Sequence, residues 1–177
     1  EIHAHGESRV ILFDWAQCDA TDYTYVEAYE HSDVKLRDES FCRAHDNSRA
    51  RVYDSSSCEA FDMSFIVSSD EGHIIAHDHS QNLLYGNSHG NFYDRSSLVA
   101  FDSVRANIRD TVVADVFNAA SVVATQSSIV RVGQSYDEDS QEIFASSHAS
   151  VILCDNSTAT VSGGHVVNIG NVEDWCD

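Results

Sequence analysis

Aspartate recurs every eight residues along most of this 177-residue chain, at Asp14, Asp22, Asp38, Asp46, Asp54, Asp62, Asp70, Asp78, Asp94, Asp102 and Asp110. If these residues stack on neighbouring coils, their carboxylates lie about 5 Å apart and repel one another. Two arrangements could compensate. Backbone N–H groups of each residue's own corner could donate to the carboxylate, with a nearby Ser assisting, or a ladder of Ca²⁺ ions could bind. The Gly-rich nonapeptide typical of calcium-binding repeats is absent, which favours the hydrogen bonds.

Histidine side chains could bind a metal ion. His73 and His89 occupy the same position of the repeat, two octads apart, and are expected on neighbouring coils of one face. A structural zinc site needs four protein ligands and a catalytic zinc site needs three. The repeat places no third ligand beside these two residues. We therefore predict no metal site, and no other cofactor.

The five cysteines form an odd set. Cys18, Cys42 and Cys58 occupy an inward position of the repeat, where a free cysteine acts as a small apolar residue. Reduced thiols favour a cytoplasmic protein. The alternatives are a strained disulfide between Cys42 and Cys58 and a pairing of Cys154 with Cys176.

An eight-residue repeat must position all these side chains. With Tyr53 as position 1, residues 5–132 divide into sixteen consecutive octads without an insertion or a deletion. Position 2 is Asp in eleven octads and position 4 is Ser in ten, while positions 6 and 8 are nearly always apolar. Positions 4, 6 and 8 follow the two-residue period of a strand, so we expect them to point inward and positions 5 and 7 to point outward.

Each octad is interpreted as a five-residue strand followed by a three-residue corner, and two octads close one coil. The pattern predicts an all-β fold, a two-faced parallel β-solenoid (β-helix) of about ten 16-residue coils. Its interior is expected to be one side chain deep on each side, with room for Ser, Ala, Cys and Val but not for larger residues. The absence of proline agrees with this fold, because proline cannot donate to a strand ladder.

The whole chain, 1–177, is expected to be a single β-solenoid domain with regular coils over 5–132. The register breaks once, and the acidic stretch 133–145 is expected to be an insertion that projects from the stack. Octads resume over 146–169 as the last coils, and residues 170–177 are expected to form a C-terminal cap.

Six outward residues on one face are apolar: Phe65, Val67, Leu83, Val99, Val113 and Ile129. On earlier coils the same columns are charged, and the opposite face offers polar residues such as His73, His89 and Arg105. A contiguous exposed apolar patch usually marks an interface. We therefore expect these six residues to join two copies of the chain about a two-fold axis.

The formal net charge of −19, from 10 basic and 29 acidic residues, argues against nucleic acid as a direct ligand, because phosphates would meet a like-charged surface. No apolar run has the length of a membrane span and no signal peptide is visible, so no membrane partner is expected. The sequence contains no nucleophile motif, phosphate-binding loop or metal triad, and we expect no enzymatic activity.

The paired octads, with Ser and Ala inward, resemble the central repeats of bacterial ice-nucleation proteins and the Asp-Ser-x-Val-x-Ala repeats of bacteria and their phages. The resemblance covers nearly the whole chain and implies a solenoid of 16-residue coils. Ice-nucleation repeats carry outward Thr at positions 5 and 7, whereas here these positions read Ser57 and Glu59, or Arg49 and Arg51.

Three functional hypotheses follow. The first is a rigid acidic binding module that mimics DNA and inhibits a nucleic-acid-binding protein. The alternative is a structural spacer or self-assembling segment of a bacterial or phage surface protein, and the third hypothesis is an ice-binding protein. In the first two cases the expected partner is a protein or a second copy of the chain.

Overall fold

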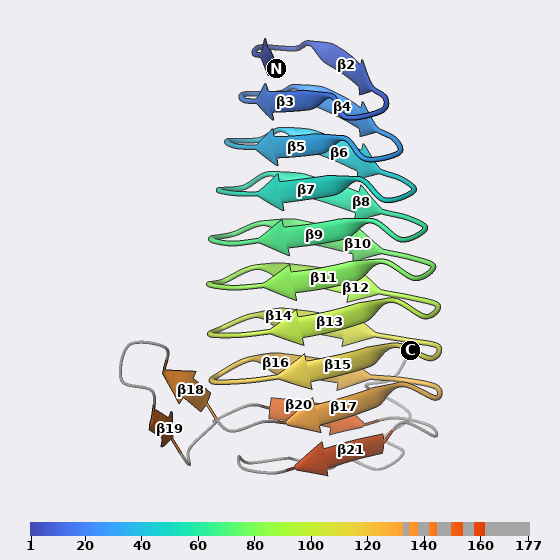
Figure 1. Ribbon diagram of the computed structural model, residues 1–177. Coiled ribbons are helices and arrows are strands. Elements are labelled where there is room, and N and C mark those ends of the chain that lie inside the picture. The colour runs from blue at the N-terminus through green and yellow to red at the C-terminus, as the bar shows by residue number, and fades with distance from the viewer. Residues whose placement is uncertain (133–134, 138–141, 145–149, 154–157, 162–177) are drawn as a thin grey trace.

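A computed structural model describes residues 1–132, 135–137, 142–144, 150–153 and 158–161. Over these residues the chain forms two parallel β-sheets wound into a β-solenoid, with its coils stacked one above another (Figure 1). The described residues include no helix, and hence no helix that could cross a membrane. The predicted all-β, two-faced parallel solenoid is confirmed.

The two sheets take alternate strands of the chain. Sheet A contains ten strands that pair in the order β1 (Ile2–Ala4), β3 (Gln17–Ala20), β5 (Asp33–Leu36), β7 (Arg49–Val52), β9 (Phe65–Ser68), β11 (Gln81–Leu84), β13 (Ser97–Ala100), β15 (Val113–Val116), β17 (Ile129–Val132) and β21 (Thr158–Val161). Sheet B contains nine strands in the order β2 (Arg9–Leu12), β4 (Tyr25–Ala28), β6 (Phe41–Ala44), β8 (Ser57–Ala60), β10 (His73–Ala76), β12 (His89–Phe92), β14 (Arg105–Ile108), β16 (Ser121–Ala124) and β20 (Ser150–Leu153).

Neighbouring strands of a sheet pair in parallel and are separated by two octads of sequence, as Ile66 is from its partner Asn82. The corners are bridged in the same way, because the N–H of Met63 donates to the carbonyl of Asp46 at 2.9 Å. Each coil therefore satisfies the backbone donors and acceptors of the next. A shift of one residue would turn every inward side chain outward, so this pairing determines both faces.

The number of residues between paired strands changes for the last strand of each sheet. Ser150 lies opposite Ser121, and Thr158 lies opposite Ile129, so these partners are further apart in sequence than the two octads that separate all earlier pairs. Within the additional length, β18 (Ser135–Asp137) and β19 (Glu142–Phe144) pair as an antiparallel hairpin. The hairpin lies beside the stack in Figure 1. The last expected octad, 162–169, and the expected cap lie outside the described residues.

Each regular strand has four residues, at positions 5 to 8, and is one residue shorter than the sequence predicted. Position 4 belongs to the corner because its N–H donates back to the carbonyl of position 1, as Ser48 does to His45 at 3.0 Å. The Ser hydroxyl often donates to that same carbonyl, and Ser32 Oγ reaches the carbonyl of Tyr29 at 2.8 Å. The side chain at position 4 is still buried, so the inward parity of positions 4, 6 and 8 is confirmed.

The core holds larger residues than the repeat predicted. Phe92, at position 8 of β12, is fully buried, as are Leu36 and Leu84. Gly90 precedes Phe92 by two residues on the same inward side, and a Cβ at Gly90 would lie 3.0 Å from the Phe92 ring and 2.4 Å from the carbonyl oxygen of Ile74. The missing side chain at position 6 thus makes room for the ring at position 8.

Ala60 occupies position 8 on β8, the same place in the octad as Phe92, but its strand has Cys58 at position 6. We expect Ala60→Phe to destabilise the fold by about 1–3 kcal/mol through overpacking, measured by urea unfolding. The double variant Cys58→Gly, Ala60→Phe should lose less stability than the sum of its two single variants, because it copies the Gly90–Phe92 pair. Simple additivity would contradict the packing explanation.

Candidate functional site

The corner carboxylates form two columns, one along each narrow edge of the solenoid. Position 2 has a positive φ in every regular octad, between 54° and 66°. Non-Gly residues tolerate this left-handed conformation poorly, and Asp and Asn tolerate it best. Two octads have glycine there instead, at Gly6 and Gly86. Backbone conformation is therefore one reason for the Asp repeat.

The carboxylates accept a hydrogen bond from the previous coil. Asp62 Oδ2 accepts the N–H of Asp46 at 3.1 Å, and Asp78 Oδ2 accepts the N–H of Asp62 at 3.2 Å. The same contact recurs at Asp94 and Asp110. The prediction that each Asp carboxylate accepts a hydrogen bond from its own corner is wrong. The donor belongs to the corner of the previous coil, because the N–H of position 2 points along the rod axis toward the next coil. The fold thus supplies a backbone N–H donor to each of these carboxylates.

The Asp column allows a stability test at Asp62. Asn keeps the tolerance of positive φ and a carbonyl acceptor for the Asp46 N–H, so we expect Asp62→Asn to change stability by less than about 0.5 kcal/mol. Ala loses both, and Asp62→Ala should cost about 2 kcal/mol from backbone strain and the lost hydrogen bond. Equal unfolding free energies for the two variants in urea would contradict this role of Asp62.

No group of three or more His, Cys, Asp and Glu side chains within the described residues is placed to hold a metal ion. One oxygen of each bonded Asp already accepts an N–H, as at Asp110, which leaves fewer ligands for a cation that takes six to eight oxygens.

We expect EDTA to leave the melting temperature unchanged, because a cation that binds only the folded state would raise it. The measurement is thermal unfolding followed by circular dichroism, with and without the chelator. A fall in melting temperature that Ca²⁺ reverses and Mg²⁺ does not would favour the calcium ladder.

Aromatic rings stack along the corners at position 1. The longest stack has centroid distances of 4.8–5.3 Å and runs through Phe13, Tyr29, His45, Phe61, His77 and Tyr93. A second stack joins Tyr85, Phe101 and Phe117. Tyr53, also at position 1, instead packs under the Lys35 ammonium, which lies 5.8 Å from its ring centroid.

Cys18, Cys42 and Cys58 are buried free thiols. Cys42 and Cys58 are paired in register on β6 and β8. Burial, and then the neighbouring Cys58 thiol, raise the pKa of Cys42 well above its usual value. A thiol that stays protonated is a poor nucleophile, so Cys42 acts as a small core side chain. Cys154 and Cys176 lie outside the described residues.

The six apolar residues predicted as an interface all lie on the outer face of sheet A. Val67, Leu83 and Val99 are paired in register on consecutive strands, and Phe65, which is 38% exposed, precedes Val67 on β9. Val113 and Ile129 continue in the other outward column. Beside these two, Asp115 and Arg131 form an ion pair at 2.6 Å. The structure thus brings Val67, Leu83 and Val99 into one stripe and separates Val113 and Ile129 from it by one column.

A homodimer through this patch stays a prediction. We expect Leu83→Asp with Val99→Asp to keep the β-sheet circular dichroism spectrum, because both side chains point outward, and to convert a dimer into a monomer in light scattering. The matched control is Ile75→Asp, which changes an outward apolar residue on sheet B. An unmutated protein that is already monomeric at micromolar concentration would refute the dimer.

Sheet B has a shallow groove of about 1050 Å³ in the middle of the rod. His73 and His89 stack at its centre with ring centroids 4.7 Å apart. Burial, assisted by the charge of His89, lowers the pKa of His73. Asn107 donates to Asn91 at 3.0 Å. Sequence reasoning placed these residues on one face but did not identify a groove, although their spacing of two octads was a usable signal.

Comparison with models of known protein families finds no match. No curated protein and no solved structure matches the chain significantly. The parallel solenoid of 16-residue coils therefore rests on the strand register and burial of this chain itself.

Proposed function

We propose that the chain is a rigid, non-enzymatic acidic module that binds the basic surface of a nucleic-acid-binding protein in place of DNA. The observation that carries this proposal is the pair of carboxylate columns along the edges. Seven consecutive coils, residues 13–124, hold twelve carboxylates at position 2, namely Asp14, Asp22, Glu30, Asp38, Asp46, Asp54, Asp62, Asp70, Asp78, Asp94, Asp102 and Asp110.

The linear charge density of these columns is somewhat more than half that of duplex DNA. At about 4.8 Å per coil, the twelve carboxylates give about one negative charge per 3 Å of rod, against one per about 1.7 Å in duplex DNA. A solenoid holds these charges at fixed spacing, so little conformational entropy is lost when a partner binds.

Charges on the sheet faces are largely paired with one another. Arg9 bonds Glu27, Arg43 bonds Glu59, Arg51 bonds Asp33 and Arg131 bonds Asp115. These arginines use carboxylates of positions 5 and 7 and not those of the edge columns, where His45 lies 4.0 Å from Asp62 and His77 lies 3.7 Å from Asp94. The net negative charge is therefore concentrated where a basic groove could contact it.

The alternative function is a structural spacer or self-assembling segment of a bacterial or phage surface protein. The resemblance to ice-nucleation and Asp-Ser-x-Val-x-Ala repeats and the apolar stripe Val67, Leu83 and Val99 favour it. Ice binding has less support, because the outward columns of the described strands mix ion pairs such as Arg43–Glu59 with apolar residues and form no Thr array.

The test is displacement of labelled duplex DNA from a panel of proteins that contains gyrase, RNA polymerase and a restriction endonuclease. Fluorescence anisotropy of the labelled DNA measures the displacement. The rod should displace DNA from at least one of these proteins, and at least 10-fold less effectively when salt is raised from about 50 to about 200 mM. The variant Asp62→Asn, Asp78→Asn, Asp94→Asn should be at least 10-fold weaker. Asn118, at position 2 with φ 54°, shows that the corner accepts Asn.

The matched control is Glu27→Gln, Glu59→Gln, Asp115→Asn, which removes the same charge from the sheet faces and leaves the edge columns intact. This control should retain most of the activity. Equal losses in the two triple variants would mean that net charge alone matters. A rod that displaces DNA from none of the proteins would refute the proposal and leave the spacer function.

A further inference from the structure

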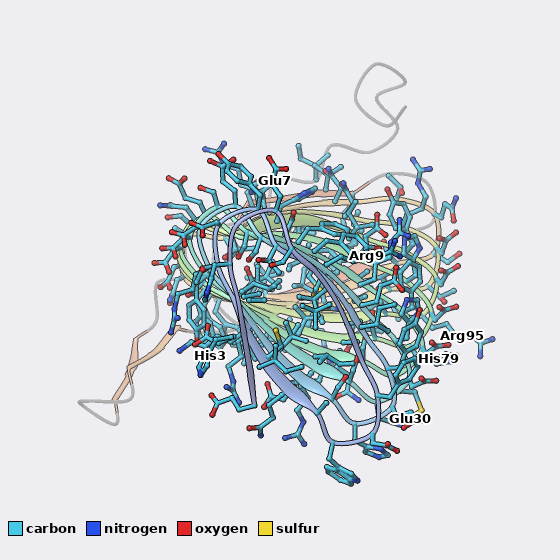
Figure 2. The ribbon with its side chains drawn as sticks, turned by 90° about the horizontal axis from the view of Figure 1, so that it is seen from above. His3, Glu7, Arg9, Glu30, His79 and Arg95 are labelled. Atoms are coloured by element: carbon cyan, nitrogen blue, oxygen red, sulfur yellow. The ribbon has the colours of Figure 1, made fainter. Side chains whose placement is uncertain are left out.

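The two edges of the rod carry different columns at position 2. Along the edge that precedes the strands of sheet A, here called the acidic edge, seven consecutive coils have a carboxylate at this position: Asp14, Glu30, Asp46, Asp62, Asp78, Asp94 and Asp110. On the opposite edge Gly86 interrupts the column. Figure 2 views the rod along its axis, with Glu30, His79 and Arg95 of the acidic edge on the side away from Glu7 of the other edge. A basic surface that spans several coils is therefore matched more closely by the acidic edge.

A notch opens in the acidic edge at Asn47. The side chains at position 3 of this edge are, in order, Trp15, His31, Asn47 and Met63. The rings of Trp15 and His31 stack with their centroids 4.6 Å apart, but the short Asn47 does not continue the stack. A space of about 520 Å³ remains there, and Phe65 also lines it.

The walls of the notch are apolar and exposed. Trp15 is 78% exposed, Met63 is 61% exposed and Phe65 is 38% exposed. Arg49 lines the notch as well. Aromatic residues, Met and Arg are the types enriched at the centre of protein interfaces, and Trp and Arg are prominent among residues that dominate binding energy. The composition of the notch is therefore that of a protein-binding site.

The notch has room for one apolar side chain. His31 and Met63 are two coil steps apart, which is about 9.6 Å along the rod. A side chain inserted between them lies about one coil step from each, or about 4.8 Å. Ring stacks in this rod have centroid distances of 4.6–5.5 Å, so the inserted group takes the place of a missing member of the stack.

Carboxylates border the notch along the rod. Asp46 directly precedes Asn47, and Asp62 directly precedes Met63, and both carboxylates are exposed. On these coils position 3 carries no Lys or Arg, whereas Arg95 occupies it further along the same edge. The groups that surround an inserted apolar side chain must therefore be basic if they are to complement this part of the edge.

The charges on the floor of the notch favour an apolar group inside it. Asp33 lies there but already bonds Arg51 at 3.0 Å. Arg49 is exposed and makes no ion pair or hydrogen bond through its guanidinium within the described part of the chain. Its positive charge disfavours a lysine or arginine in the notch itself. The matching partner thus has an apolar side chain at the centre of a basic surface.

We propose that the acidic edge binds a DNA-bending protein that carries an apolar wedge, and that the notch at Asn47 receives the wedge. Proteins of this class insert Phe, Leu, Ile, Met or Pro between base pairs while their basic residues contact the DNA around it. A gap in a stack of rings beside a column of carboxylates is complementary to that surface. This inference rests on the function proposed above and adds the class of partner.

Two other occupants match the notch less well. A second copy of this chain, with its formal charge of −19, would bring like charges against the acidic edge. A basic protein without a wedge could contact the carboxylates but would leave the apolar walls of Trp15 and Met63 exposed.

The experiment measures binding of the full chain to a fluorescently labelled HMG-box protein, which carries such a wedge, by fluorescence anisotropy. Asn47→Trp fills the notch and should weaken binding about 10-fold, because a buried anchor supplies much of the energy of an interface. An HMG-box variant with alanine in place of its wedge should lose about the same factor. The two changes together should cost little more than either alone, since both remove one contact.

Asn87→Trp is the matched control, because Asn87 is also exposed at position 3 but lies on the opposite edge. It should bind the HMG-box protein like the unmutated chain. Circular dichroism should show the same β-sheet spectrum for both variants, since position 3 already accepts Trp15 and the N–H of Asn47 still donates to the carbonyl of Glu30.

Several results would overturn the wedge assignment and leave the proposed function standing. They are an unchanged affinity of Asn47→Trp, an equal loss with Asn87→Trp, additive losses in the combined variants, and a rod that displaces DNA from the panel proteins but does not bind the HMG-box protein. Conversion of a dimer into a monomer by Asn47→Trp in light scattering would assign the notch to a second copy instead. A rod that binds none of these proteins would refute both proposals.

Discussion

The hydrogen-bond ladder between coils, with its constant period of two octads, underlies every other feature of this rod. Parallel pairing satisfies the strands, but position 2 of each corner takes a positive φ and its N–H points along the rod axis. The carboxylate of the following coil meets that N–H, as Asp62 does for Asp46. The ladder therefore continues around the corner through side chains. Aspartate is first an element of the fold, and the acidic edge is a consequence.

Because every coil repeats the same backbone, residues at the same octad position line up in columns on the surface of the rod. Positions 2 and 4 are occupied by structural requirements, whereas positions 3, 5 and 7 can vary from coil to coil. The chain uses this freedom differently on its surfaces. Sheet A carries the Val67–Leu83–Val99 stripe, and sheet B carries the His73–His89–Arg105 column. Functions based on spacing suit such a rod, because the coil step sets the distance between equivalent groups.

The core shows where an inward residue of the repeat can be replaced by one of a different size. Buried side chains range from Ser and Ala to Leu and Ile, and the still larger Phe92 is accepted because Gly90 beside it lacks a side chain. Asn82 is another exception, and its amide donates to the carbonyl of Ser97 at 3.1 Å. Close packing allows such exchanges only when the volumes of neighbours compensate. The repeat thus constrains the total side-chain volume inside each coil more than the identity of each inward residue.

The octad register, the inward parity of positions 4, 6 and 8, and the assignment of Val67 and His73 to opposite sheets were all predictable from the amino-acid sequence. These features follow from a two-residue strand period and a constant repeat length, which are local properties of the chain. Three others required the folded coils: Asp78 bonds the corner of the previous coil, Phe92 fills the space beside Gly90, and His73, His89 and Arg105 line one groove. The spacing along the chain indicates which of these residues are neighbours, but the way their side chains meet depends on the packing of the neighbouring coils.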